Sequence, residues 1–390
     1  MSHSKKEEDS SQALSSKWVA CSLEEQYYGD SRKVFRAERK RLSAKDRSKY
    51  KKTDLDKYEK GIKKEIADKK NETLLARGRV LSITSQGFIV EYNGQLYTCF
   101  LRGLLKKQKT QHKNIVTVGD FVLFEELAGR EGYIIEVEER KSILSRADNL
   151  SRRKEQLIAA NIDQVLITVS VVSPPLKPHL IDRYIIAARK GGMAPVILIN
   201  KTDLLESEKV EQHVRHEQLN LLKECEAAYR KAEIPLILLS AEKGTGIDGL
   251  KDVMKNKSSV FSGQSGAGKS SLINFVTHLN LSVGETVQKT GKGSHTTTCT
   301  HLVPLDFGGL CIDTPGIKSF GIWDLSEQEI VSYFAEIQEF SNECKYPNCS
   351  HTHELDCAII RAFECGKISP IRYASYVSLI ETMREEHKRR

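Results

Sequence analysis

A glycine-rich segment, GQSGAGKS at residues 263–270, has the G-x4-G-K-[ST] spacing of a phosphate-binding loop. Gly263 and Gly268 would let backbone N–H groups turn inward around a phosphate. Lys269 would reach the β- and γ-phosphates of a nucleotide, and Ser270 would bind Mg2+. A strand-like segment precedes the loop and a helix-like segment follows it, which argues against a chance match. We expect the following residues to line the nucleotide: Gly263, Gln264, Ser265, Gly266, Ala267, Gly268, Lys269, Ser270 and Ser271.

The segment NKTD, at residues 200–203, ends an apolar stretch and carries the side chains that would read a guanine base. The Asp203 carboxylate can accept hydrogen bonds from N1–H and from the exocyclic amine, whereas adenine lacks that amine and has an acceptor at N1. Losing a polar contact of this kind costs several orders of magnitude in selectivity. Lys201 can lie across the base, and the backbone of Ser240 and Ala241 can donate to the guanine oxygen. These segments predict that the nucleotide is GTP rather than ATP. The residues expected to contact the guanine base are Asn200, Lys201, Thr202, Asp203, Ser240 and Ala241. A surface turn is the alternative for NKTD taken alone.

Two other segments could contact Mg2+ and the γ-phosphate. Asp313 begins DTPG, at residues 313–316, directly after an apolar strand, so its carboxylate could hold Mg2+ through water. The backbone amide of Gly316 could face the γ-phosphate. The segment GKGSHTTTCT, at residues 291–300, has the position of a first switch, where one threonine closes on Mg2+. The candidates for that threonine are Thr296, Thr297 and Thr298.

The attacking water must be positioned either by a residue other than the usual glutamine or by a group that a partner supplies. Ras-like enzymes place a glutamine just after the glycine of DxxG, but this chain has Ile317 there. His295, beside the three threonines, could orient water, since its unperturbed pKa is near neutral. An exposed loop histidine is the alternative. Unassisted turnover is expected to be slow, at roughly 10⁻⁴ to 10⁻² s⁻¹.

The order of these motifs along the chain is unusual. The guanine-reading segment comes first, the phosphate loop second and the γ-phosphate segment third. A circular permutation of a GTPase domain gives this order without altering the folded site, because chain termini often lie close together on a compact domain. The segment after Gly316 then leads directly into the C-terminal part of the chain. We expect nucleotide-dependent motion to be transmitted there.

Three of the nine cysteines, together with one histidine, form the pattern C-x4-C-x-H-x5-C. Three thiolates and one imidazole suit a closed, structural zinc site. The predicted ligands are Cys344, Cys349, His351 and Cys357, with His353 and Cys365 as less favoured candidates. Reduced cysteines in a helical core are the alternative. The remaining cysteines are scattered, and an odd total does not suit a disulfide framework.

Charge is concentrated near the N-terminus of this 390-residue chain. Its net charge is +8, and residues 31–72 contain 17 Lys/Arg against 8 Asp/Glu. This basic extension is either a solubilising tail or an arm that binds nucleic acid through phosphates. The sequence has no secretory signal and no apolar run of the ~20 residues that span a bilayer. We therefore expect a cytoplasmic protein without membrane association, and a monomer.

The elements that must position these motifs divide into a β-rich, an α/β and a helical part. Five short alternating segments between residues 74 and 140 favour a small β-barrel of the oligonucleotide-binding (OB) type, with an SH3-like barrel as the alternative. Apolar strands then alternate with helical stretches to about residue 322, which indicates a mostly parallel sheet covered on both faces. The expected domains are residues 1–72 (basic extension), 73–142 (barrel), 143–322 (circularly permuted α/β P-loop GTPase) and 323–390 (helical zinc-binding domain).

These motifs together resemble the ribosome small-subunit-dependent GTPase A family. The resemblance depends on NKTD, GQSGAGKSS, GSHTTT, DTPGIKSFG and the Cys/His pattern, and it covers about residues 74–390. It implies GTP hydrolysis stimulated by the small ribosomal subunit late in its maturation. It also implies that the barrel and the zinc domain contact ribosomal RNA and that hydrolysis drives release.

Three other functions use some of the same motifs. A large-subunit assembly GTPase would generally lack a barrel before the GTPase domain and a zinc knuckle behind it. A GTP-sensing RNA-binding protein that rarely hydrolyses GTP would explain Ile317, although the Mg2+ and γ-phosphate residues argue against it. An ATP-using enzyme would leave Asp203 without a role.

Overall fold

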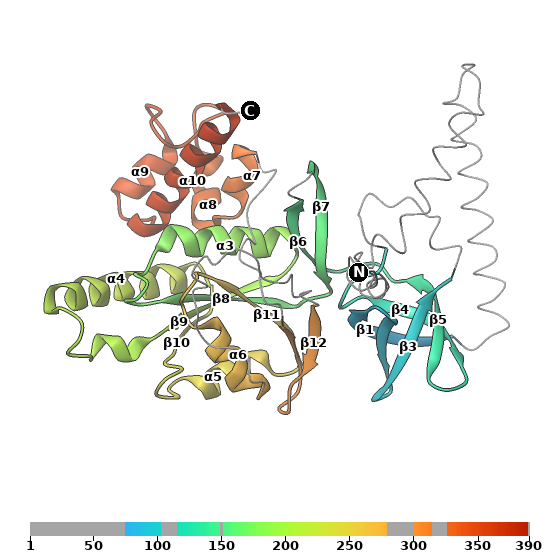
Figure 1. Ribbon diagram of the computed structural model, residues 1–390. Coiled ribbons are helices and arrows are strands. Elements are labelled where there is room, and N and C mark those ends of the chain that lie inside the picture. The colour runs from blue at the N-terminus through green and yellow to red at the C-terminus, as the bar shows by residue number, and fades with distance from the viewer. Residues whose placement is uncertain (1–74, 103–114, 149–150, 279–299, 314–325, 389–390) are drawn as a thin grey trace, which may run out of the picture. The chain divides into compact units, whose positions relative to one another are not determined.

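The structure is a computed structural model that describes residues 75–102, 115–148, 151–278, 300–313 and 326–388 (Figure 1). Residues 68–390 belong to one compact unit, and the account below concerns its described part. The predicted basic extension lies outside the described residues. Among the helices within them, none combines the length and the apolar character that crossing a bilayer requires.

The first five described strands close into a barrel. Antiparallel pairs join β1 to β2, β2 to β3, β4 to β5 and β1 to β4, and a parallel pair joins β3 to β5. Side chains that alternate along the strands fill the interior, among them Val80, Val90 and Phe124, all fully buried. The predicted OB-type barrel is confirmed. Its strands are β1 (Ala76–Thr84), β2 (Gly87–Tyr92), β3 (Gln95–Leu101), β4 (Phe121–Leu127) and β5 (Glu131–Val137).

The α/β part contains a sheet in the order β10-β9-β8-β11-β13-β12, in which all neighbours are parallel except β12 and β13. The strand that leads into the phosphate loop, β11, is central among these six strands, although three of them, β8, β9 and β10, precede it in the chain. This is the arrangement expected of a circular permutation. The strands are β8 (Gln164–Ser170), β9 (Ala194–Asn200), β10 (Leu236–Leu238), β11 (Ser258–Gly263), β12 (His301–Pro304) and β13 (Leu310–Asp313).

Helices cover both faces of this sheet, as predicted, and each face has its own apolar cluster (Figure 1). On one face, Ile181 of α3 (Pro178–Lys190) and Leu222 of α4 (Gln212–Lys231) pack against β-strand residues such as Val260. On the other face, Leu250 of α5 (Ile247–Met254) and Leu272 of α6 (Lys269–Thr277) pack in a second cluster with strand residues such as Phe261. The phosphate loop joins β11 to α6 and so belongs to the α5–α6 face.

A hairpin between the barrel and the sheet was not predicted. It consists of β6 (Ile143–Asp148) and β7 (Ser151–Ala160), which form a separate two-stranded sheet. Its sequences, ILSRAD and SRRKEQLIAA, lack the period-two apolar alternation that marked the barrel strands. Nearby, the Asn161 side chain donates to Gly119 O at 3.1 Å and accepts from Lys141 N at 2.9 Å, which joins the barrel to the chain beyond the hairpin.

The C-terminal part is helical, as predicted, but its first stretch is divided. Instead of one helix over residues 325–340, α7 (Glu327–Ser332) and α8 (Ala335–Ser341) flank a non-helical Phe334 with φ −109° and ψ 89°. This break turns the Phe334 ring into the core, where it is fully buried and packs edge-on against Tyr376 at 5.7 Å. The remaining helices are α9 (Ala358–Glu364) and α10 (Pro370–Lys388).

A buried ionic cluster joins the C-terminal helices to α3. The guanidinium of Arg372, on α10, is 1% exposed, pairs with Asp182 of α3 and donates to Glu336 of α8 at 2.5 Å. It also lies 4.3 Å above the Phe334 ring. Both carboxylates lie close to this desolvated cation. Removing any one of the three groups would leave another charge poorly solvated and unpaired, which is energetically costly.

We expect Arg372→Met to destabilise the chain by about 3–5 kcal/mol, because the substitution leaves the buried Asp182 and the partly buried Glu336 without their cation. Urea unfolding monitored by circular dichroism measures the loss. Arg384→Met is the matched control, since Arg384 and Glu327 form an ion pair whose side chains are 36% and 40% exposed. That pair is worth less than about 1 kcal/mol. Equal losses in the two variants would contradict a special role for the buried cluster.

Candidate nucleotide and zinc sites

The predicted phosphate loop connects the end of β11 to the start of α6. Gly263 has φ 132° and Gly268 has φ 91°, both in the region that favours glycine. A Cβ atom at Gly263 would lie 2.1 Å from the Thr168 carbonyl oxygen, and one at Gly268 would lie 2.4 Å from Asn200 Nδ2. Both glycines of the motif are therefore required by backbone conformation and by the close approach of neighbouring strands.

Lys269 is the first residue of α6, and its ammonium lies over the loop. It donates to Gly263 O at 3.0 Å and to Gln264 O at 2.7 Å. The loop is held to β8 by Gln264 N, which donates to Thr168 O at 3.1 Å. Ser265 and Gly266 at the tip are exposed, whereas Ala267 is buried and Ser270 and Ser271 are half-buried in the first turn of α6.

The Asn200 side chain connects the phosphate loop to the other predicted nucleotide segments. It is 1% exposed, donates from Nδ2 to Ala267 O at 2.9 Å, and accepts at Oδ1 from Ala241 N at 3.1 Å. The Asn200 side chain thus holds together the segments around Ala241 and Ala267, which lie 41 and 67 residues from it in the sequence. The sequence motifs at 200–203, 240–241 and 263–271 form one site.

The rest of the guanine-reading segment is held by the loop after β10. Thr202 donates from Oγ1 to Leu239 O at 3.0 Å, and Asp203 accepts at Oδ1 from Ser240 Oγ at 2.5 Å. Ser240 Oγ in turn accepts from Lys243 N at 3.1 Å. Because the Asp203 carboxylate is half-buried and its Oδ1 is engaged by a neighbouring hydroxyl, its orientation is set by the fold.

The site includes a segment that the sequence motifs did not indicate. Lys201 donates from Nζ to Ser173 O at 2.7 Å, and Gln264 donates from Nε2 to Pro175 O at 3.5 Å. The chain just after β8 therefore lies beside both the guanine-reading segment and the phosphate loop. The signal that could have found it is its position, since ligands in open α/β sheets bind beyond the carboxyl ends of the strands.

The γ-phosphate end of the site is described only in part. The backbone of Asp313 ends β13, which pairs in parallel with β11. The predicted γ-phosphate glycine, Gly316, lies outside the described residues, as do the catalytic candidate His295 and the Mg2+ candidates Thr296, Thr297 and Thr298. Their roles stay predictions.

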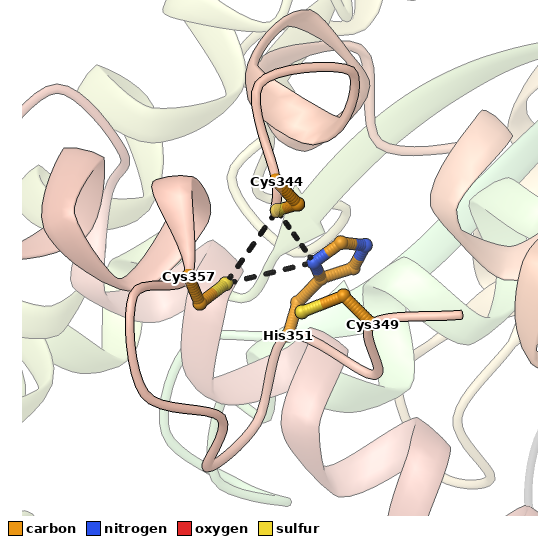
Figure 2. A group of neighbouring side chains, drawn as sticks. All are labelled: Cys344, Cys349, His351 and Cys357. Atoms are coloured by element: carbon orange, nitrogen blue, oxygen red, sulfur yellow. Dashed lines mark hydrogen bonds between the residues drawn. The ribbon is translucent and has the colours of Figure 1, made fainter. Parts of the chain in front are cut away.

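The four predicted zinc ligands come together in the C-terminal part, as Figure 2 shows. The ligand atoms of Cys344, Cys349, His351 and Cys357 all lie within 4.8 Å of one another. The Cys344 and Cys357 sulfurs are 3.8 Å apart, and His351 Nδ1 is 3.4 Å from the first and 3.6 Å from the second. His353 is exposed and bonded to Thr352, and Cys365 is an exposed thiol that is not part of the cluster.

These separations fit a tetrahedral zinc ion. With Zn–S bonds of about 2.3 Å and Zn–N bonds of about 2.0–2.1 Å, two sulfurs lie about 3.8 Å apart and a sulfur and a nitrogen about 3.6 Å apart. The soft sulfur donors also match zinc rather than Mg2+. All four first-coordination positions come from the chain, so the arrangement is that of a structural site rather than a catalytic one.

Neighbouring groups hold the ligand loop in place. The hydroxyls of Tyr373 and Tyr376, both on α10, donate to His351 O and Ser350 O at 3.0 Å each. The Glu354 carboxylate accepts from Ser350 N at 2.7 Å and from Thr352 N at 3.1 Å. Partial burial raises the pKa of Glu354, but hydrogen bonds from Ser350, from the backbone of His353 and from its own backbone outweigh burial and hold that pKa well below its usual range. Glu354 is therefore ionised at neutral pH and fastens the loop.

The protonation of the ligands also depends on burial. Burial raises the pKa of the Cys349 thiol to about 12 and raises that of Cys357, and it lowers the pKa of the His351 imidazole. At neutral pH the imidazole is thus in the uncharged form that binds metals. The thiols would be protonated on their own, and a divalent cation converts them to thiolates.

Comparison with known proteins gives two family matches along the chain. Residues 77–134 match the family described as RsgA N-terminal domain, and residues 137–323 match the family described as RsgA GTPase. The first covers the barrel strands except for the start of β1 and the end of β5. The second covers the hairpin, the strands β8–β13 and every described residue of the predicted nucleotide site.

Individual relatives extend over most of the chain. A protein of Chlorobaculum parvum named small ribosomal subunit biogenesis GTPase RsgA is 39% identical over 325 residues, which are 81% of this chain and 100% of that protein. A Bacteroides fragilis protein of the same name is 37% identical, covering 79% of this chain and 97% of its own. Among solved structures, YjeQ from Thermotoga maritima matches with a TM-score of 0.63 and 32% identity, covering 79% of this chain and 98% of its own. YloQ, described as a circularly permuted GTPase, matches with a TM-score of 0.63 and 27% identity, and the match covers 80% of this chain and 96% of YloQ.

Proposed function

The chain belongs to the RsgA family of GTPases, and on that premise we propose that it acts on the small ribosomal subunit. In this proposal the protein binds the maturing subunit with GTP, hydrolyses GTP at a rate stimulated by the subunit, and dissociates. The observation that supports it best is the order of parts, with a permuted GTPase sheet between an OB-type barrel and a Cys3His cluster. The relatives that match most of the chain are named for small-subunit biogenesis.

The residues divide the work at the nucleotide. Asp203 reads the guanine edge, and the Asn200 side chain keeps the loop at 240–241 in register with the phosphate loop. Lys269 moves from the loop carbonyls to the phosphates, and the N-terminal end of α6 faces the same negative charge. Mg2+, held by Ser270 with Asp313 and one of the three threonines, would neutralise the charge that develops on the phosphates.

The flanking parts supply contacts to the subunit. A Zn2+ ion held by Cys344, Cys349, His351 and Cys357 would stabilise the helical module, which with the barrel would contact ribosomal RNA. The division into a basic extension (1–72), barrel (73–142), GTPase (143–322) and zinc domain (323–390) is part of the proposal. So are a cytoplasmic location and a monomeric state.

Turnover measurements with and without purified subunits test this function. We expect GTP hydrolysis to rise by one or more orders of magnitude with small subunits and to stay near the unassisted rate with large subunits. Co-sedimentation should show association with small subunits in a non-hydrolysable GTP analogue and less in GDP. Stimulation by large subunits instead, or binding to small subunits with no turnover, would support one of the other functions considered above.

His295→Ala should separate nucleotide binding from hydrolysis. If His295 orients the attacking water, the variant keeps its affinity for GTP but loses about 10²- to 10⁴-fold of the subunit-stimulated rate, the contribution typical of a positioned acid or base. Single-turnover hydrolysis and GTP titration measure the two quantities. His216→Ala is the control, because His216 is an exposed histidine on α4, on the face of the sheet opposite to the phosphate loop. An unchanged stimulated rate in His295→Ala would remove this residue from the mechanism.

A further inference from the structure

Ser170, the last residue of β8, has a buried hydroxyl whose role the nucleotide motifs do not explain. The residue is fully buried, and its Oγ has no hydrogen-bond partner among the residues that the structure describes. Leaving a buried hydroxyl unpaired costs about 1–3 kcal/mol, so such a group calls for an explanation.

The position of Ser170 places it beside the phosphate loop. It is paired in register with Asn200, the side chain that holds the loop through Ala267 O. Side chains alternate along a strand, and Leu166, four residues earlier on β8, packs in the α5–α6 cluster. Ser170 therefore lies on the face of the sheet that carries α6 and the phosphate loop. Asn200 lies on the same face, because Leu198, two residues earlier on β9, packs in the same cluster.

A second polar atom in the same region is also unpaired. The loop begins beside β8, since Gly263 is in register with Thr168 and Gln264 N donates to Thr168 O, two residues before Ser170. Gln264 Oε1 is buried without a partner within the described part of the chain. Within the described part of the chain, Ser170 Oγ and Gln264 Oε1 are thus two unpaired polar atoms near the point where the phosphate loop leaves the sheet.

We propose that Ser170 is a positioning residue of the nucleotide site, whose hydroxyl forms its hydrogen bond only when a guanine nucleotide occupies the phosphate loop. The loop carbonyls of Gly263 and Gln264 accept from the Lys269 ammonium. When that ammonium contacts phosphates, the carbonyls lose their donor, and Ser170 supplies a hydroxyl that has no competing partner among the described residues. The hydrogen bond favours the nucleotide-bound form of the loop. This inference rests on the proposed function, because it requires a guanine nucleotide in the site.

The chain offers a matched control in Ser262, the residue before Gly263. It is 1% exposed, and its Oγ also lacks a partner among the described residues. It lies, however, on the opposite face of the sheet, because Val260, two residues earlier on β11, packs in the cluster with α3 and α4. A hydroxyl there is as buried as that of Ser170 but does not face the loop.

The test compares Ser170→Ala with Ser262→Ala. Both variants should melt at or above the wild-type temperature without nucleotide, because each loses an unpaired buried hydroxyl. In titrations with a fluorescent GDP analogue and Mg2+, Ser170→Ala should bind about tenfold more weakly, while Ser262→Ala binds like wild type. Ser170→Cys, of similar size but a weaker donor, should bind with intermediate affinity.

Two results would overturn the inference while leaving the proposed function intact: wild-type affinity in Ser170→Ala, or an equal loss of affinity in both alanine variants. A lower melting temperature of Ser170→Ala without nucleotide would also overturn it, since the hydroxyl would then have a partner in the free protein. Failure of the wild-type chain to bind the GDP analogue would be a different result, because it would remove the proposed function and the inference with it.

Discussion

Replacing Cys357 by serine is expected to abolish zinc binding and to unfold the ligand loop together with the start of α9. Cys357 is 3% exposed and is the residue immediately before α9, so a bond from its sulfur to zinc would also fix where that helix begins. The loop from Cys344 to Cys357 contains no helix or strand of the described structure, and it exposes Tyr346 and Leu355, at 52% and 87%. Apolar burial therefore contributes little to its stability, and zinc binding, worth about 10–16 kcal/mol in small zinc modules, contributes most.

Zinc content and limited proteolysis measure this effect. The wild-type chain should contain one zinc ion, and the Cys357→Ser chain should contain none and be cleaved within residues 344–357. Cys365→Ser is the control, because it removes an exposed thiol outside the cluster and should leave both readouts unchanged. A stoichiometric zinc ion in Cys357→Ser, or a protease-resistant loop without zinc, would show that the metal does not hold this segment.

Zinc loss should have little direct effect on nucleotide affinity. The C-terminal helices join the GTPase sheet through Asp182 of α3, on the face opposite to α6 and the phosphate loop. The hydrogen bonds of Asn200 that assemble the nucleotide site do not involve the C-terminal residues. A Cys357→Ser chain that still binds GTP but fails to associate with subunits would separate the two sites.

The parts that could be predicted from the sequence are those in which the signal is local. The phosphate-loop motif lies between one strand and one helix, and the four predicted zinc ligands lie within a stretch of 14 residues, so spacing alone was enough to predict that each set of residues lies together. The barrel strands alternate with period two because one side of each strand faces a closed core. Spacing alone could not show that NKTD lies beside the phosphate loop. The contact between them joins residues 67 positions apart and depends on how the permuted sheet folds.

The features that were not predicted depend on contacts between distant segments. Arg372 and Asp182 are 190 residues apart. Taken alone, each is a charged residue in a helical segment and would be predicted to face solvent. Phe334 interrupts a helical pattern because burying its ring against Tyr376 outweighs the local preference for a continuous helix. Ser173 and Pro175 carry no motif, and only the packing of β8 beside β9 and β11 brings their carbonyls to the nucleotide site.

Asp203→Asn should change the base that the site accepts. A carboxylate accepts two hydrogen bonds, which matches the two donors of guanine, whereas an amide accepts one and donates one. The asparagine NH2 would meet the exocyclic amine of guanine, and GTP affinity should fall by about three orders of magnitude or more. Xanthine has a carbonyl in place of that amine, so xanthosine triphosphate should bind the variant better than GTP does.

The geometry makes this substitution a test of recognition rather than of folding. Asp203 is half-buried and accepts from Ser240 Oγ, a hydrogen bond that the asparagine carbonyl oxygen can keep, so the loop after β10 should retain its position. Competition of GTP and xanthosine triphosphate against a fluorescent nucleotide measures the preference of each chain, and Asp248→Asn, an exposed carboxylate on α5, controls for the loss of one charge. If the Asp203→Asn chain still preferred GTP, the base would be read by other groups, and the assignment of guanine to residues 200–203 would be wrong. A reversed preference with unchanged thermal stability would place the carboxylate against the base edge, because no other change in the variant alters the donors and acceptors of the pocket.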